Sequence, residues 1–147
     1  MTVQVAVILA RKGTEVVTIR PDATLADAAA SLGERDVGAL VVSGDGRSVQ
    51  GVLSERDIVR CLAESGAGAL GRTVGEVMTA EVHTCERDTT ADELMALMTT
   101  RRIRHVPVLE DDRLAGIVSI GDVVKSRIDE LETQTEALQG YVTGSSY

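Results

Sequence analysis

The chain has 147 residues, which is long enough for one compact domain with a buried core and no disulfide or structural metal. It has no Phe or Trp and only Tyr141 and Tyr147, so the core must be aliphatic and aromatic platforms for stacking nucleic-acid bases are missing. Its 15 basic and 23 acidic residues give a formal net charge of -8, which disfavours binding to nucleic acid or to an anionic membrane. An anionic ligand would need a local cluster of basic side chains.

Cysteine usage and the N-terminal sequence indicate the compartment. Cys61 and Cys85 form neither a C-x-x-C motif nor the pattern of a secreted disulfide scaffold, so buried free thiols are expected. No succession of basic, apolar and small residues typical of a signal peptide opens the chain, and no apolar run reaches the length of a membrane span. These features predict a soluble cytoplasmic protein.

The first half of the chain predicts alternating short strands and helices. Residues 2–12 fit a short helix and a strand equally well. Thr24, with Asp27 three residues later, is a candidate N-cap for a helix that ends near Gly33. The apolar run Val37 to Val42 predicts a buried strand. The predicted elements are strand 15–19, helix 24–33, strand 37–42, strand 49–53 and a helix from Ser54 through Leu62.

The second half repeats this order after a linker. Three glycines among small residues at 66–71 predict the linker, and Thr73 with Glu76 predicts a capping box for a single-turn helix. Thr90 with Glu93 predicts the cap of the next helix. The remaining predicted elements are strand 82–85, strand 103–109, a turn at 110–112 and strand 114–118.

The two halves match residue by residue. Thr18 corresponds to Thr84 at an offset of 66, and Ser54 corresponds to Ser119 at an offset of 65, after one residue is lost in the hairpin loop. A match that holds across all elements indicates a tandem duplication. It predicts an α+β fold of two β-α-β-β-α units related by approximate twofold symmetry, with paired clefts along their seam.

One stretch recurs most clearly, Gly51-Val52-Leu53-Ser54-Glu55-Arg56-Asp57 and Gly116-Ile117-Val118-Ser119-Ile120-Gly121-Asp122. An apolar pair followed by Ser-x-x-Asp predicts a strand that ends at a helix start, because serine is a preferred N-cap and aspartate suits the first turn. Capping alone would explain each copy. The duplication of the whole unit favours a second role, in which both corners also face clefts.

The last helix, predicted from 123 to 140, carries a narrow seam. Its members follow a 4-3-4-3 spacing typical of helix pairing: Val124, Ile128, Leu131, Thr135 and Leu138. The seam fits a subunit contact and a helix that rests on its own domain equally well.

These motifs together resemble the CBS domain, named after cystathionine β-synthase. The resemblance rests on Val-x-Thr, Thr-x-x-Asp or Thr-x-x-Glu, then Gly-Ala-Leu-Val-Val or Arg-His-Val-Pro-Val, and Gly-Ile-Val-Ser-x-x-Asp. Two repeats, at 14–65 and 72–129 and joined through 74–79, look like a stand-alone CBS-domain pair that forms a single module over residues 1–147, with the C-terminal helix at 123–140.

The resemblance implies a regulatory sensor module that is not an enzyme and requires no metal. CBS pairs bind AMP, ADP, ATP, NAD(H) or S-adenosylmethionine in the clefts between repeats, usually form flat homodimers, and can act on an effector protein. A structural dimerisation module with vestigial clefts is the alternative. A small enzyme is disfavoured, because the sequence shows no Ser-His-Asp or Cys-His arrangement, no Walker loop and no metal-ligand cluster.

The family's roles can be carried over to matching positions. The aspartate that bonds the ribose hydroxyls corresponds to Asp57 and Asp122, and the serine near phosphate corresponds to Ser54 and Ser119. The full set of residues expected to bind the ligand is Thr18, Gly38, Ala39, Ser54, Arg56, Asp57, Thr84, Arg104, His105, Val106, Pro107, Ser119 and Asp122.

The copies differ in ways that predict unequal sites. Arg56, a candidate phosphate partner or a solvated helix charge, stands where the second copy has Gly121. Arg104 and His105 interrupt an apolar strand and point either into a cleft or to an exposed edge; the cleft is favoured.

Five other residues complete this comparison. As their family positions imply, Val106 and Pro107 should pack against adenine. His83 is expected to be a surface histidine. Lys12, like Arg20, could neutralise phosphate, but a solvated role is expected.

Overall fold

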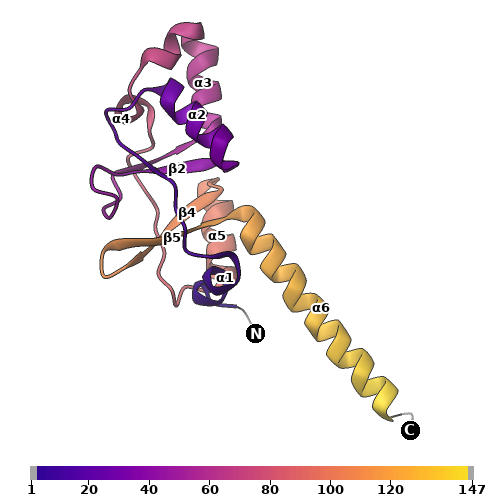
Figure 1. Cartoon of the computed structure of the whole chain (residues 1–147). Coiled ribbons are helices and arrows are strands. Elements are labelled where there is room, and N and C mark those ends of the chain that lie inside the picture. The colour runs from indigo at the N-terminus through magenta and orange to yellow at the C-terminus, as the bar shows by residue number, and fades with distance from the viewer. Residues whose placement is uncertain (1–2, 146–147) are drawn as a thin grey trace.

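The computed structural model describes residues 3–145, with side chains described through residue 139. It is an α+β fold in which two units of similar element order, the second without the first strand, lie one above the other (Figure 1). The first unit comprises β1 (Thr18–Ile19), α2 (Leu25–Arg35), β2 (Ala39–Val42), β3 (Gly51–Ser54) and α3 (Glu55–Ser65). The second unit comprises α5 (Ala91–Arg101), β4 (His105–Glu110), β5 (Arg113–Ser119) and α6 (Ile120–Ser145). The connecting segments are α1 (Val5–Lys12), the 3-10 helix η1 (Gly66–Gly71) and α4 (Val74–Val77).

The two sheets are built alike but differ in one strand. In the first unit β1 runs parallel to β2, and β2 pairs with β3 in antiparallel register. In the second unit β4 and β5 are antiparallel. The predicted strand 82–85 is reduced to a single parallel bridge between Cys85 and Val108. Only Cys85 continues the ladder, by donating to Pro107 O and accepting from Leu109 N.

Helix α2 runs two residues further than predicted, to Arg35. Gly33 does not end it; the left-handed turn is made by Asp36, with φ 53°. Asp is one of the few residues other than glycine that enters this region at low cost. The capping box predicted from Thr24 and Asp27 is confirmed.

The ambiguous segment 2–12 contains a helix, α1, and this helix belongs to the core of the second unit. Val5, Ile8 and Leu9 are buried there beside Leu94 and Val118. These spacings of three and one place the apolar side chains on one helical face. Tertiary burial therefore decides between the two periodicities that the sequence left open.

The linker makes the reciprocal contact. Val74 of α4 is buried in the core of the first unit, and Thr73 bridges to Thr24. The capping box predicted at Thr73 and Glu76 is wrong: no side chain caps α4 from Thr73, and Glu76 instead pairs with Arg72 at 3.2 Å. Each unit is thus completed by the segment that precedes the other one.

Two glycines permit α1 and the segment that follows α4 to cross close to the sheets. A Cβ on Gly51 would lie 2.5 Å from Met78 Sδ and 2.9 Å from Thr79 O, and a Cβ on Gly116 would lie 2.8 Å from Leu9 Cδ2. At Gly51 the crossing segment includes the fixed carbonyl of Thr79, so this position needs glycine, whereas at Gly116 only the side chain of Leu9 would have to shift.

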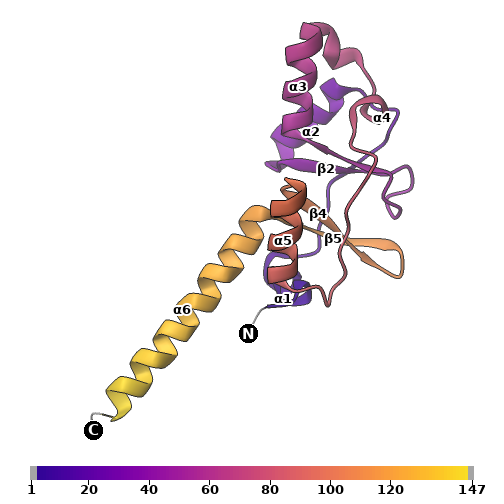
Figure 2. The same cartoon turned by 180° about the vertical axis from the view of Figure 1, so that it is seen from behind.

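Helix α6 leaves the body of the molecule. Val123 and Ser126 are buried near its start, while the helix beyond them extends into solvent, as both views show (Figures 1 and 2). Within the described residues, no helix combines the length and apolarity needed to cross a membrane.

Candidate functional site

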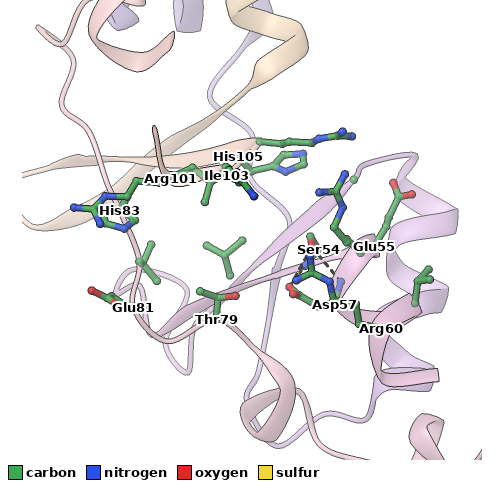
Figure 3. Close-up of a pocket in the computed structure, with 17 residues that line it drawn as sticks. Ser54, Glu55, Asp57, Arg60, Thr79, Glu81, His83, Arg101, Ile103 and His105 are labelled. Atoms are coloured by element: carbon green, nitrogen blue, oxygen red, sulfur yellow. Dashed lines mark hydrogen bonds between the residues drawn. The ribbon is translucent and has the colours of Figure 1, made fainter. Parts of the chain in front are cut away.

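A cleft of about 610 Å³ lies between the two units (Figure 3). One wall comes from the end of β3 and the first turns of α3, and the other from the end of α5 and the start of β4. The segment after α4 closes one side with Thr79, Glu81 and His83. The volume falls in the range of sites for small molecules and cofactors.

The first corner, Ser54 to Asp57, forms part of the cleft wall. Ser54 Oγ accepts a hydrogen bond from Asp57 N at 3.3 Å, and Asp57 Oδ2 accepts from Ser54 N at 2.8 Å and from Ser54 Oγ at 3.1 Å. The predicted cap is therefore confirmed. Asp57 Oδ1 accepts no hydrogen bond from the described residues, so one carboxylate oxygen remains for a ligand. Capping and ligand binding can thus use the same residues.

The second corner, Ser119 to Asp122, has the same cap but an additional partner. Asp122 Oδ2 accepts from Ser119 N at 2.8 Å, and Asp122 N donates to Ser119 Oγ at 3.1 Å. Lys12 Nζ lies 2.6 Å from Asp122 Oδ2 and 2.7 Å from Ile117 O. The expectation that Lys12 is merely solvated is wrong, because its side chain is only 29% exposed and bridges two elements.

The two corners differ because different segments approach them. At the first corner Val52 O accepts from the backbone N–H of Thr79 at 3.0 Å. At the second, Ile117 O accepts from the Lys12 ammonium instead. Burial raises the pKa of Asp122, but hydrogen bonds from Lys12 and Ser119 outweigh it and hold this pKa below its ordinary value. Asp122 is thus an ionised, internally paired carboxylate.

Arg104 and His105 both line the cleft, and His105 lies at the start of β4 (Figure 3). His105 lies against the first unit: a Cβ on Gly38 would be 3.2 Å from His105 Nε2. Burial lowers the pKa of His105 more than the carboxylates of Asp122 and Glu55 raise it, so the ring is neutral at neutral pH. Gly38 is the residue whose small size lets this ring approach.

The cleft gathers six of the predicted ligand-binding residues and leaves the others elsewhere. Those in its wall are Gly38, Ser54, Arg56, Asp57, Arg104 and His105. Those outside it are Thr18, Ala39, Thr84, Val106, Pro107, Ser119 and Asp122. Strand alternation accounts for Val106, which follows His105 and faces the core with no exposed surface. Pro107 is also buried, paired across the sheet with Ile117.

Several lining residues were not among those predicted to bind the ligand. Arg60 lies one helical turn after Arg56, and Arg101 and Arg102 immediately precede the predicted strand. The basic run at 101–104 was a signal that could have found them in so acidic a chain. His83, expected on the surface, also lines the cleft. No group of three or more His, Cys, Asp or Glu among the described residues is placed to hold a metal ion.

The repeated unit and the polar cleft at its seam define a tandem α+β module. A model of the CBS domain matches residues 10–64 and again residues 74–129. The chain therefore belongs to the CBS-domain family as a tandem pair, and the predicted resemblance is confirmed. It is 38% identical over 127 residues to the mitochondrial CBS domain-containing protein CBSX3 of Arabidopsis thaliana, a match that covers 84% of this chain but 62% of that protein.

Solved structures show the same fold. A CBS-domain protein from Agrobacterium tumefaciens has 48% identity and a TM-score of 0.82, with 86% of this chain and 95% of that chain covered. The CBS-domain pair of protein MJ0100 has 25% identity and a TM-score of 0.77, with 88% of this chain and 99% of that chain covered. The MJ0100 pair was crystallised with 5′-methylthioadenosine and S-adenosyl-L-methionine.

Proposed function

We propose that this protein is a non-catalytic regulatory module that binds an adenine nucleotide in the cleft between its repeats. The observation that carries the proposal is the first corner, where a capped carboxylate with one unused oxygen stands in the wall of a cleft large enough for a nucleotide. The adenosine-derived ligands of the MJ0100 pair support the nucleoside part of the assignment.

Each part of the nucleotide has a matching group. Asp57 would accept hydrogen bonds from the two ribose hydroxyls, a task suited to an ionised carboxylate. Arg56 would face phosphate, because a guanidinium favours an anion. The backbone N–H groups of Glu55 and Asp57 in the first turn of α3 already donate to Gly38 O and Ser54 Oγ. Neutral His105 can donate or accept without adding charge.

The second corner would bind a ligand only after rearrangement. Lys12 already neutralises Asp122, so a ribose that approached this carboxylate would have to displace a 2.6 Å ion pair. We therefore place the nucleotide in the cleft beside Asp57, with one ligand per chain. Occupancy of the second corner would require Lys12 to move.

The regulatory output would pass through association, for which a homodimer is the first expectation. Val59 on α3 and Val124 on α6 are 62% and 44% exposed and occupy matching positions of the two repeats. Large apolar side chains repeated at matching exposed sites fit a subunit contact. The exposed apolar seam of α6 also favours the second candidate, a dimerisation module with vestigial clefts.

A thermal-shift screen separates the two candidates. Adenosine, AMP, ATP, NADH and S-adenosylmethionine are tested against the folded protein, because a ligand that binds only the native state raises its melting temperature. At a concentration 100 times the dissociation constant the stabilisation is about 2.7 kcal/mol, which is several degrees for a chain of this size. A shift with at least one of these compounds supports the nucleotide site. If the protein is folded and none of these compounds raises its melting temperature, the nucleotide site is contradicted and the dimerisation module is the remaining candidate.

A further inference from the structure

The arginine side chains around the cleft form no ion pair with any residue that the structure describes. Seven of the 15 Lys and Arg residues form an ion pair with a described acidic side chain: Arg11, Lys12, Arg20, Arg35, Arg72, Arg87 and Arg127. Eight form no ion pair with any described residue, and five of those eight line this one cleft: Arg56, Arg60, Arg101, Arg102 and Arg104. The unpaired positive charge of an acidic protein is therefore concentrated at its proposed ligand site.

The acidic residues of the cleft do not cancel this charge. Three carboxylates line it, Glu55, Asp57 and Glu81, against five guanidiniums. Asp57 is directed toward Ser54 by its hydrogen bonds. Arginine stays protonated at any accessible pH, so the cleft keeps a positive excess while the whole chain carries -8. A concave cationic site in an acidic protein concentrates anions locally.

The five arginines stand on two opposite walls. Arg56 and Arg60 are one turn apart on α3, which places their Cβ atoms about 6 Å from each other. Arg101, Arg102 and Arg104 come from the end of α5 and the approach to β4, which form the other wall of the cleft. A single phosphate is satisfied by one or two bidentate guanidiniums. Five guanidiniums distributed over two walls exceed what one phosphate can use.

We propose that the cleft binds a nucleoside di- or triphosphate, with the arginines holding the phosphate chain, and that it discriminates against ligands without phosphate. The proposal rests on the nucleotide-binding function proposed above and specifies the ligand class of the same site. It also separates this chain from the MJ0100 pair, whose two named ligands carry no phosphate. S-adenosylmethionine has a sulfonium cation, which the unpaired arginines would repel.

A ligand series at constant ionic strength tests the assignment by calorimetry. Adenosine, AMP, ADP, ATP and S-adenosylmethionine are titrated without divalent cations. Affinity should rise along the series from adenosine to ATP, by about tenfold or more between AMP and ATP, since each charge-assisted contact contributes about one such factor. Increasing the salt concentration should weaken the binding of ATP strongly and the binding of adenosine little. Sodium tripolyphosphate should compete with ATP but bind more weakly than ATP does.

The possible failures are distinct. Equal affinity for AMP and ATP, or tighter binding of S-adenosylmethionine than of ATP, would overturn the phosphate-chain assignment and leave the nucleotide site intact. Tripolyphosphate that binds as tightly as ATP would show that the cleft takes any polyanion and not a nucleotide. No binding of any nucleoside compound would remove both proposals.

Matched variants locate the effect. Arg60→Ala and Arg101→Ala, both at exposed positions, should each lower the affinity for ATP by about fivefold or more. The affinity for adenosine should stay unchanged. Arg47→Ala removes the same charge from an exposed arginine outside the cleft and should change neither affinity. Arg60→Lys should restore part of the ATP affinity. Equal losses of adenosine and ATP in the two cleft variants would indicate a structural role and contradict the proposal.

Discussion

At the scale of single residues, the two corners show how two copies of one motif come to make different contacts. Ser54 with Asp57 and Ser119 with Asp122 form the same cap. Of the two aspartates, only Asp122 also pairs with a lysine, Lys12, which is 110 residues away in the chain. Local pattern predicted both caps correctly because a cap depends on four consecutive residues. It could not predict the lysine contact, because that contact depends on where α1 docks.

The Lys12–Asp122 pair should stabilise the fold in a pH-dependent way. Both side chains are less than a third exposed, so Lys12→Ala should cost about 1–2 kcal/mol at pH 7. Because the folded-state pKa of Asp122 lies below its ordinary value of 3.8, this stabilisation is complete above that pH and is lost as pH falls through the folded-state pKa. Urea unfolding of both proteins at pH 7 and pH 3 measures the difference.

The control for this measurement is Lys125→Ala, an exposed lysine of α6 without an ion pair among the described residues. The free energy of unfolding of this variant should match that of the wild type at both pH values. A Lys12→Ala deficit that is the same at pH 3 and pH 7 would show that Lys12 acts through packing and not through the Asp122 carboxylate.

At the scale of elements, the exchange of α1 and α4 between the units is what the sequence concealed. Each helix lies next to one repeat in sequence but is buried in the core of the other. Strand and helix identities follow from local periodicity and caps, and most were predicted. The bounds were not, as Asp36 and Cys85 illustrate, because helix ends and short ladders depend on a single turn or bridge.

The crossing segments predict a sharp difference between glycines. Gly51→Ala should destabilise the protein by about 1–3 kcal/mol, because the new methyl group meets Met78 Sδ and the fixed carbonyl of Thr79. Gly33→Ala, within α2 and with nothing near its Cβ, should stabilise by up to about 1 kcal/mol. Thermal unfolding of both variants checks this. A neutral Gly51→Ala would mean that the segment does not cross β3 so closely.

At the scale of the whole molecule, α6 has two faces. Val123 and Ser126 are buried against the body, whereas Ile128 and Leu131 are 49% and 47% exposed. At 100° per residue the centre of the exposed seam lies about 130° around the helix from the buried residues Val123 and Ser126, so the body of its own chain does not cover it. The sequence left both interpretations of this helix open, and the two faces accommodate both.

The seam leads to a prediction about assembly. If it joins two copies, the wild type should be a dimer by sedimentation at micromolar concentration, and the double variant Ile128→Asp with Leu131→Asp should shift toward the monomer. Thr133→Asp, at an exposed position on the far side of the helix, serves as the control and should leave the dimer intact. A wild type that stays monomeric, or a double variant with unchanged mass, would contradict a seam between copies.

The cleft beside Asp57 is the proposed nucleotide site. Calorimetry with ATP on the wild type, Asp57→Asn and Asp122→Asn tests it most directly, because asparagine can still accept the capping hydrogen bonds. If the cleft beside Asp57 binds the nucleotide, the wild type should bind one ATP per chain, Asp57→Asn should reduce the affinity about tenfold or more, and Asp122→Asn should change it little. Full affinity in Asp57→Asn, or a loss confined to Asp122→Asn, would contradict this assignment.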